Sequence, residues 1–293
     1  MVDTVADIRA FNRFYTERIG ALDEQFLGQD RPLGEARLLF EIGQDGASVS
    51  DLRARLGLDS GYVSRLLRRL EEDGLVTTEP DPADGRRRIA RMTPAGEREW
   101  TTLDRLSDRQ VEAIVAPLGE RRAGELADAL RLAHRLIAAA AVTLDVVDAR
   151  STDAQQAMAA YFAELDALFP TGFDPGDALT ADVHAYDAPS GAFVVAYTAD
   201  RRPVGCGGMW TMEPGVGEIK RMWVAPDWRG VGLAGRILSD LEDRSRAVGH
   251  ERTVLDTNGV LHDAIAMYER SGYRAIDRYN DNPYAEHWFE KVW

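Results

Sequence analysis

The stretch that decides the fold of the C-terminal half reads Glu218-Ile219-Lys220-Arg221-Met222-Trp223-Val224-Ala225-Pro226-Asp227-Trp228-Arg229-Gly230-Val231-Gly232-Leu233-Ala234. An apolar, strand-forming run passes into a loop with an arginine and two glycines, and a helix follows. Glycine lets the backbone approach a ligand closely, and a helix N-terminus presents unpaired N–H groups with a partial positive charge. The loop is therefore suited to a pyrophosphate. Taken alone, two glycines before a helix are also typical of a tight turn.

Strand and helix patterns alternate around this loop. Strands are expected at 142–147, 192–198, 204–210, 218–224, 253–256, near Tyr273 and at 287–292, and helices at about 152–169, 230–248 and 261–271. Before residue 141 the pattern is mainly helical, with helices at 3–27, 35–42, 94–116 and 120–140, two more between 50 and 74, and short strands at 76–79 and 89–92. The change predicts a multidomain chain, with a mainly-α domain at 1–141 and an α/β domain at 142–293.

Composition argues against several classes of protein. The chain has 35 basic and 49 acidic residues, a net charge of −14, and an acidic body is repelled by phosphate, so a surface coated with nucleic-acid contacts is not expected. The single cysteine, Cys206, excludes an intrachain disulfide and a multi-cysteine zinc site, and the five histidines lack metal-ligand spacing, so we expect no metal. With no signal-peptide pattern and no apolar run near the roughly 20 residues that span a bilayer, we expect a cytoplasmic protein without a membrane partner.

The region between residues 53 and 91 is locally basic, with nine arginines against seven acidic residues. Its second helix has one apolar stripe at Val63, Leu66, Leu67 and Leu70. The opposite face can enter a DNA major groove, and a basic hairpin follows. The expected DNA contacts are Ser60, Tyr62, Ser64, Arg65, Arg68, Arg69, Arg86, Arg87 and Arg88. The alternative is an ordinary solvated face, since acidic residues at 59 and 71–73 reduce its positive charge.

This region resembles the MarR family of winged helix-turn-helix regulators over about residues 3–140. The matching residues are Tyr62-Val63-Ser64-Arg65-Leu66-Leu67-Arg68-Arg69-Leu70-Glu71-Glu72-Asp73-Gly74-Leu75-Val76, the wing Asp84-Gly85-Arg86-Arg87-Arg88, and Met92-Thr93-Pro94-Ala95-Gly96. The resemblance implies an ion pair of Asp84 with Arg86 in the wing and wing arginines on DNA. It also implies a homodimer, paired through the long flanking helices on a palindromic operator, and in many members a small effector that releases the DNA.

The C-terminal half resembles the GNAT superfamily of acetyl-CoA-dependent N-acetyltransferases (acyl-CoA N-acyltransferases) over about residues 142–293. The loop has the spacing Arg-x-x-Gly-x-Ala at Arg229, Gly232 and Ala234. It is followed by Leu255-Asp256-Thr257-Asn258 and by Ala264-Ile265-Ala266-Met267-Tyr268-Glu269-Arg270-Ser271-Gly272-Tyr273. A Rossmann fingerprint is a different pattern, because its glycines follow the first strand of the unit with an acidic residue about 20 positions later.

The resemblance implies acetyl-CoA as co-substrate and assigns residues to it. The strand residues Met222, Trp223 and Val224 would pair with the pantetheine, and Asn258 would contact it. Tyr268 would donate a proton to the departing thiolate, although Tyr268 also has the spacing of a core residue. The diphosphate would lie on Arg229, Gly230, Val231, Gly232, Leu233 and Ala234.

Transfer to an amine needs a general base, and Glu218 is the candidate, acting directly or through a water; a strand-end carboxylate in solvent is the equal alternative. Cys206 is expected to pack rather than to react. The resemblance implies that acceptor specificity comes from residues 170–177 and 279–289, where acids and Tyr279, Tyr284 and Trp288 favour a small cationic amine. Such residues are also common in exposed loops.

Three functions are compatible with these patterns. The first is a transcription regulator fused to an N-acetyltransferase that acetylates a small amine by direct transfer. The second is a regulator whose C-terminal half senses acetyl-CoA without catalysis. The third is an acetyltransferase whose N-terminal half only dimerises.

Overall fold

The computed structural model describes residues 3–23, 25–82, 84–169, 172–174 and 183–293. The chain divides into two compact units, Met1–Leu130 and Arg131–Trp293. This division falls within helix α6 (Gly119–Ala140), which runs from the first unit into the second. None of the described helices has the length and apolarity that a bilayer-spanning segment needs.

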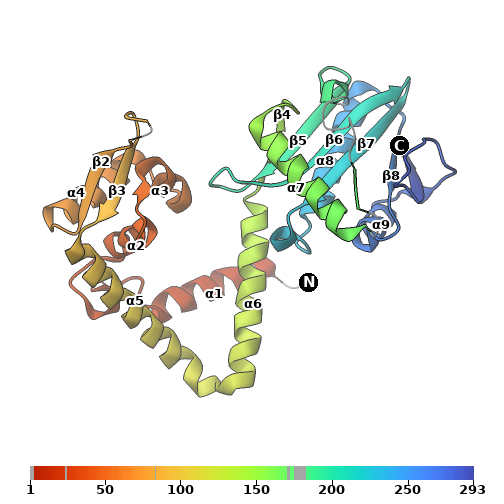
Figure 1. Cartoon of the computed structure of the whole chain (residues 1–293). Helices are drawn as coiled ribbons and strands as arrows, with labels where there is room; N and C mark the ends of the chain where they lie inside the picture. The colour runs from red at the N-terminus through yellow and green to blue at the C-terminus, as the bar shows by residue number, and fades with distance from the viewer. Residues whose placement is uncertain (1–2, 24, 83, 170–171, 175–182) are drawn as a thin grey trace. The chain divides into compact units, whose positions relative to one another are not determined.

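The first unit is helical with one small sheet, whose strand order is β1-β3-β2 (Figure 1). Its helices and strands are α1 (Thr4–Arg18), η1 (Phe26–Gly28), α2 (Leu33–Ile42), β1 (Ala47–Ser48), α3 (Val49–Leu56), α4 (Ser60–Glu72), β2 (Val76–Pro80), β3 (Arg88–Met92), α5 (Pro94–Val115) and η2 (Ala116–Leu118).

Local signals account for most of these elements. Gly57 ends α3 in the left-handed conformation, and the Asp59 side chain caps α4 by accepting from the Tyr62 N–H at 2.9 Å. Thr93 caps α5, with Pro94 at its first position. The apolar stripe of α4 is fully buried in the core of this unit, as its spacing predicts. The helix-turn-helix and hairpin pattern is therefore confirmed.

Two expected helices are shorter than their patterns. The helix expected at 3–27 ends at Arg18, because the chain turns at Gly20 (φ +64°) and continues into the short 3-10 helix η1. The helix expected from residue 230 begins at Leu233, because Gly230 (φ +73°) and Gly232 (φ +83°) are left-handed.

The second unit is a seven-stranded sheet between helices, with strand order β4-β5-β6-β7-β8-β10-β9. Its neighbours are antiparallel except for the parallel pair β7–β8. One apolar core joins α7 to one face, and another joins α8 and α9 to the other (Figure 1). The elements are β4 (Thr143–Val147), α7 (Thr152–Leu168), η4 (Val183–Tyr186), β5 (Gly191–Tyr197), β6 (Pro203–Glu213), β7 (Val216–Val224), η5 (Pro226–Trp228), α8 (Leu233–Val248), β8 (Arg252–Thr257), α9 (His262–Arg270), β9 (Arg274–Ala275) and β10 (His287–Val292).

Candidate functional site

A bulge in β7 opens the centre of the sheet. Arg221 has φ +59° in mid-strand, and the pairing with β6 shifts register at this point, between Cys206 and Gly208. The parallel pairing of β7 with β8 covers only Val216–Glu218 against Arg252–Val254. Beyond Glu218 the described residues of β7 are no longer paired with β8, although the Val224 carbonyl accepts a hydrogen bond from Arg229.

A cavity of about 430 Å³ lies where the two strands separate. Its wall comes from β7, β8, α7, α9 and the segment before β10. The lining residues are Tyr161, Phe162, Leu165, Phe169, Phe173, Asp174, Ile219, Lys220, Arg221, Met222, Asp256, Thr257, Asn258, Leu261, Ala264, Tyr268, Asn282, Pro283 and Tyr284.

The three β7 residues assigned to pantetheine meet the cavity differently. Met222 lines it and also packs against the apolar core beneath α8. The indole N–H of Trp223 donates to Glu164 of α7 at 2.9 Å, and Val224 is buried in the core beneath α8. Trp223 and Val224 therefore offer a ligand their backbone rather than their side chains.

The loop at 229–234 has the geometry of an anion cradle. Its two left-handed glycines lead directly into α8, and no side chain caps the helix at Gly232. The first N–H groups of α8 therefore remain available to an anion. The side chain of Arg229 is engaged elsewhere, because Nε donates to the Val224 carbonyl at 2.9 Å and Nη2 pairs with Glu164 at 2.5 Å.

Asn258 and Tyr268 both lie on the cavity wall. Asn258 donates to the Tyr284 carbonyl at 2.7 Å, and its oxygen accepts from the Val260 N–H at 3.0 Å. Tyr268 is 5% exposed and packs against Tyr273 and Phe289, so it is a core residue and a wall residue at once. Burial raises the pKa of Tyr268, with Tyr161 and Asp256 adding to the effect. The group is held in the protonated form that an acid needs.

Glu218 is 4% exposed and belongs to a buried polar cluster rather than to a solvated strand end. Its Oε1 accepts from the Tyr279 hydroxyl at 2.8 Å and lies 3.2 Å from Lys220 Nζ. Among the described residues that line the cavity are Lys220 and Asp256, but not Glu218. Glu218 itself does not line the cavity, but the Lys220 side chain that it contacts belongs to a lining residue.

Lys220 links two carboxylates, with its Nζ 3.1 Å from Asp256 Oδ1 in addition to the Glu218 contact. Burial, the largest single effect, favours the neutral amine, but the two carboxylates outweigh it and raise the pKa of Lys220. The other Asp256 oxygen accepts from Asn282. Neither Lys220 nor Asp256 was assigned from the sequence, although Asp256 lies in the quoted strand before Asn258.

The expected acceptor region is only partly described, because residues 170–171 and 175–177 lie outside the described residues. The rings of Phe173 and Tyr284 are tilted against each other with centroids 4.8 Å apart, and Phe169 stacks on Tyr284 at 5.7 Å. Tyr279 and Trp288 face the Glu218 cluster instead, since Trp288 donates to Asn280, which also contacts Glu218. The α7 aromatics Tyr161 and Phe162 complete a wall that the sequence analysis missed.

The expected DNA-contact residues lie on the exposed face of α4 and on the hairpin. Ser60, Tyr62, Ser64, Arg65, Arg68 and Arg69 are exposed, and the Arg65 guanidinium lies over the Tyr62 ring. Arg69 also pairs with the buried Glu35 at 3.0 Å, which ties this face to α2.

The wing is shaped by hydrogen bonds along the hairpin. The backbone N–H of Arg86 donates to Asp84 Oδ1 at 3.1 Å, so the expected link between these residues runs through the backbone of Arg86. Arg87 lies 3.6 Å from Asp51, and Arg88 donates to Thr78 on the facing strand. The three arginines thus differ in how freely they can reach a ligand.

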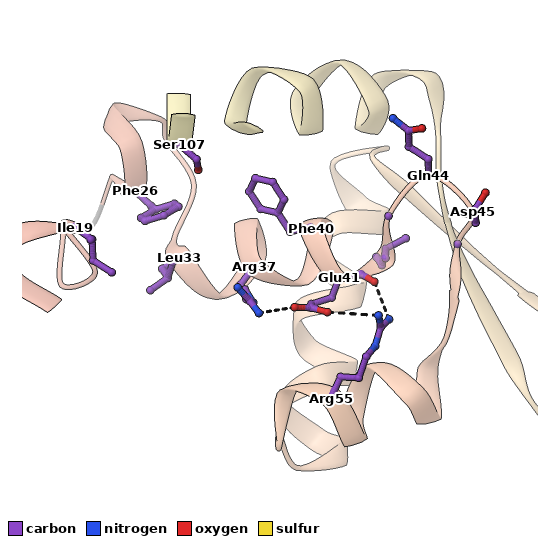
Figure 2. A pocket seen from close by; sticks show the side chains of 13 residues that line it. Ile19, Phe26, Leu33, Arg37, Phe40, Glu41, Gln44, Asp45, Arg55 and Ser107 are labelled. Atoms are coloured by element: carbon purple, nitrogen blue, oxygen red, sulfur yellow. Dashed lines mark hydrogen bonds and ion pairs between the residues drawn. The ribbon is translucent and has the colours of Figure 1, made fainter. Parts of the chain in front are cut away.

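A second cavity, of about 700 Å³, lies in the first unit (Figure 2). Its wall includes the rings of Phe26 and Phe40. Figure 2 shows Glu41 between two arginines, 2.6 Å from Arg37 and 3.6 Å from Arg55. None of these residues was expected from the sequence to form a site.

Cys206 is buried beneath α7, and its thiol donates to the Arg221 carbonyl at 3.4 Å. Burial raises the pKa of the Cys206 thiol to about 12, which keeps it protonated and unreactive. Within the described ranges, histidine, cysteine and carboxylate side chains do not gather into a group that could hold a metal ion.

Comparison with known proteins separates the two halves. The MarR family model matches residues 29–87, and the acetyltransferase (GNAT) family model matches residues 158–273. An IAA acetyltransferase of Azospirillum brasilense is 32% identical over 141 residues, which are 48% of this chain and 90% of that protein.

The N-terminal half is similar to the uncharacterized HTH-type transcriptional regulator YdgJ of Bacillus subtilis, 29% identical over 86 residues. That match spans 29% of this chain and about half (52%) of the regulator. A solved acetyltransferase from Streptococcus agalactiae is 18% identical, with a TM-score of 0.46, and the match covers 52% of this chain and 99% of that one.

Proposed function

Because this chain belongs to the acetyltransferase (GNAT) family and also carries a MarR-family segment, we propose that it is a DNA-binding regulator that transfers acetyl groups from acetyl-CoA to a small amine. One observation carries the catalytic part of the proposal. The pairing of β7 with β8 ends at Glu218, shortly before the bulge at Arg221, and a cavity lies beyond it, with Tyr268 in its wall and the 229–234 loop following the strand.

The residues present fit acetyl-CoA. The β7 residues Met222–Val224 lie beyond the end of the pairing with β8, so their backbone suits the amides of the pantetheine, which would lie there as an added strand would. The uncapped N–H groups after Gly232 suit the diphosphate, and Asn258 is placed to orient the arm. When bound there, acetyl-CoA supplies an activated acetyl thioester.

Direct transfer needs one proton acceptor and one proton donor from the protein. A carboxylate accepts the proton of the amine as its nitrogen bonds to the acetyl carbon, and Tyr268 gives its proton to the sulfur as the C–S bond breaks. Asp256 lines the cavity, whereas Glu218 does not. Glu218 remains the proposed base, with Lys220 and Asp256 between it and the cavity.

The enzymatic part is tested by release of free thiol from acetyl-CoA in the presence of a panel of small amines. We expect at least one amine to give thiol and the matching N-acetyl product in equal amounts. CoA binding with no product from any amine would instead favour the alternative of a regulator that senses acetyl-CoA.

The regulatory part rests on the exposed arginines of α4 and the wing. We propose that a homodimer places α4 of each subunit in the major groove of a palindromic operator, with Arg65, Arg68 and the wing arginines on phosphates. The 700 Å³ cavity of the first unit is the proposed place for an effector.

DNA binding is tested with Arg68→Ala on a labelled duplex selected from a random-sequence library by the full-length protein. Loss of one phosphate contact should weaken binding and lower the slope of log affinity against log salt by about one. Arg98→Ala, an exposed arginine of α5, is the control that removes the same charge elsewhere. If no duplex is enriched by the wild-type protein, the alternative of an N-terminal half that only dimerises is favoured.

A further inference from the structure

The C-terminal end of helix α6 lies against the loop proposed to hold the diphosphate, within the second unit. Arg135 of α6 donates a hydrogen bond from Nη2 to the backbone carbonyl of Arg229, the first residue of that loop. One turn later Ala139 is buried, and its carbonyl accepts from Arg236. Arg236 also donates to the Val142 carbonyl at 2.7 Å. The end of α6 is therefore held both by the loop and by the first turn of α8.

The guanidinium of Arg135 is available to an anion. The side chain is exposed, and among the described residues no carboxylate pairs with it. Its Nη2 lies 3.7 Å from where a Cβ on Gly230 would be. An arginine has five N–H donors, and the Arg229 carbonyl takes only one of them. The side chain of Arg229, in contrast, shares its donors with Glu164 and the Val224 carbonyl.

We propose that Arg135 binds the phosphate groups of acetyl-CoA at the 229–234 loop, so that helix α6 is itself part of the cofactor site. This inference rests on the acetyl-CoA site proposed above. It adds a binding residue, Arg135, that lies outside the segment matched by the acetyltransferase family model. Helix α6 is continuous from Gly119 to Ala140, and its residues up to Leu130 belong to the first unit. Cofactor binding would therefore restrain the C-terminal end of α6, at residues 131–140.

The first test measures binding of CoA, which lacks the acetyl group and so is not turned over, by isothermal titration calorimetry. Arg135→Ala should weaken CoA binding roughly tenfold, because a charge-assisted hydrogen bond to phosphate is lost. Arg122→Ala, another exposed arginine of α6, is the matched control and should bind CoA as the wild type does. Alanine favours helix, so both variants are expected to keep α6.

Dephospho-CoA, which lacks the 3′-phosphate, identifies the phosphate involved. A tenfold loss that persists with dephospho-CoA assigns Arg135 to the diphosphate, and a loss that disappears assigns it to the 3′-phosphate. Hydrogen exchange gives a readout besides affinity: saturating CoA should slow exchange at 131–140 in the wild type and less so in Arg135→Ala.

Two failures are distinguishable. If the wild type binds no CoA, the proposed acetyltransferase function falls and this inference falls with it. If the wild type binds CoA and Arg135→Ala binds it equally tightly, or if exchange at 131–140 is unaffected by CoA in the wild type, this inference alone is overturned.

Discussion

Tyr268 combines an observed position in the core with the proposed role of proton donor. Tyr268→Phe keeps the ring that packs against Tyr273 and Phe289 but removes the proton donor. We expect turnover to fall by about 100-fold or more, with little change in CoA affinity. Because burial raises the pKa of Tyr268, the hydroxyl stays protonated beyond its usual range, so wild-type activity should not decline below pH 10 through this group. Steady-state kinetics and calorimetry check the two parts, and unchanged turnover would remove the role.

Lys220 has a structural consequence that can be measured separately from activity. Lys220→Met leaves Glu218 and Asp256 close together without their shared cation, and we expect a loss of about 3 kcal/mol in the free energy of unfolding. The folded pKa of Lys220 is raised, so its stabilisation is complete below the unfolded value of about 10.5 and is lost as pH rises through the folded pKa. Urea unfolding should therefore show a smaller difference in the free energy of unfolding between the wild type and Lys220→Met at pH 11 than at pH 7.

A double variant controls for the lost lysine side chain itself. Lys220→Met with Glu218→Gln removes one of the two charges that repel, and it should recover part of the loss. Equal stability of Lys220→Met and the wild type at pH 7 would contradict the proposed linkage.

At the scale of the element, the turn into α8 has a conformation that only glycine adopts without strain. Gly232→Ala puts a Cβ at φ +83°, where the space is open but the backbone costs about 1–2 kcal/mol. The loop should shift, and CoA affinity should fall about tenfold. Gly249→Ala ends the same helix at φ +101°, also with open space, so it should lose similar stability and keep CoA affinity. Equal CoA affinity of the two variants would argue against the loop as a phosphate cradle.

Element boundaries followed local signals closely where a cap or a proline was present. Thr93 and Pro94 mark the start of α5 at the expected residue 94, whereas the expectation of two helices between 50 and 74 gave no exact start for α4, which Asp59 caps. The apolar spacing at 3–27 was misleading, because it continues across Gly20, where the helix has already ended. Periodicity reports which residues are apolar, but a left-handed glycine decides where the hydrogen-bonded helix stops.

At the scale of the whole molecule, helix α1 has no buried residue, although it is rich in large apolar side chains. Ile8 is 51% exposed and Phe14 63% exposed, and such surfaces usually mark an interaction site. We expect the protein to sediment at twice 32.5 kDa. Ile8→Asp with Phe14→Asp should yield the monomer and weaken DNA binding. Val260→Asp, at an exposed apolar residue of the second unit, should remain dimeric; a wild-type monomer would refute the pairing.

The sequence by itself determined the two fold classes, the order of most elements and the glycine loop, because caps, apolar periodicity and turn residues act over a few neighbouring positions. Only the tertiary structure decided that Lys220 pairs with Asp256, that Arg229 pairs with Glu164, and that Arg135 donates a hydrogen bond to the Arg229 carbonyl of the loop. These partners are 36, 65 and 94 positions apart, and which of them meet depends on strand order, the bulge at Arg221 and the packing of helices on the sheet.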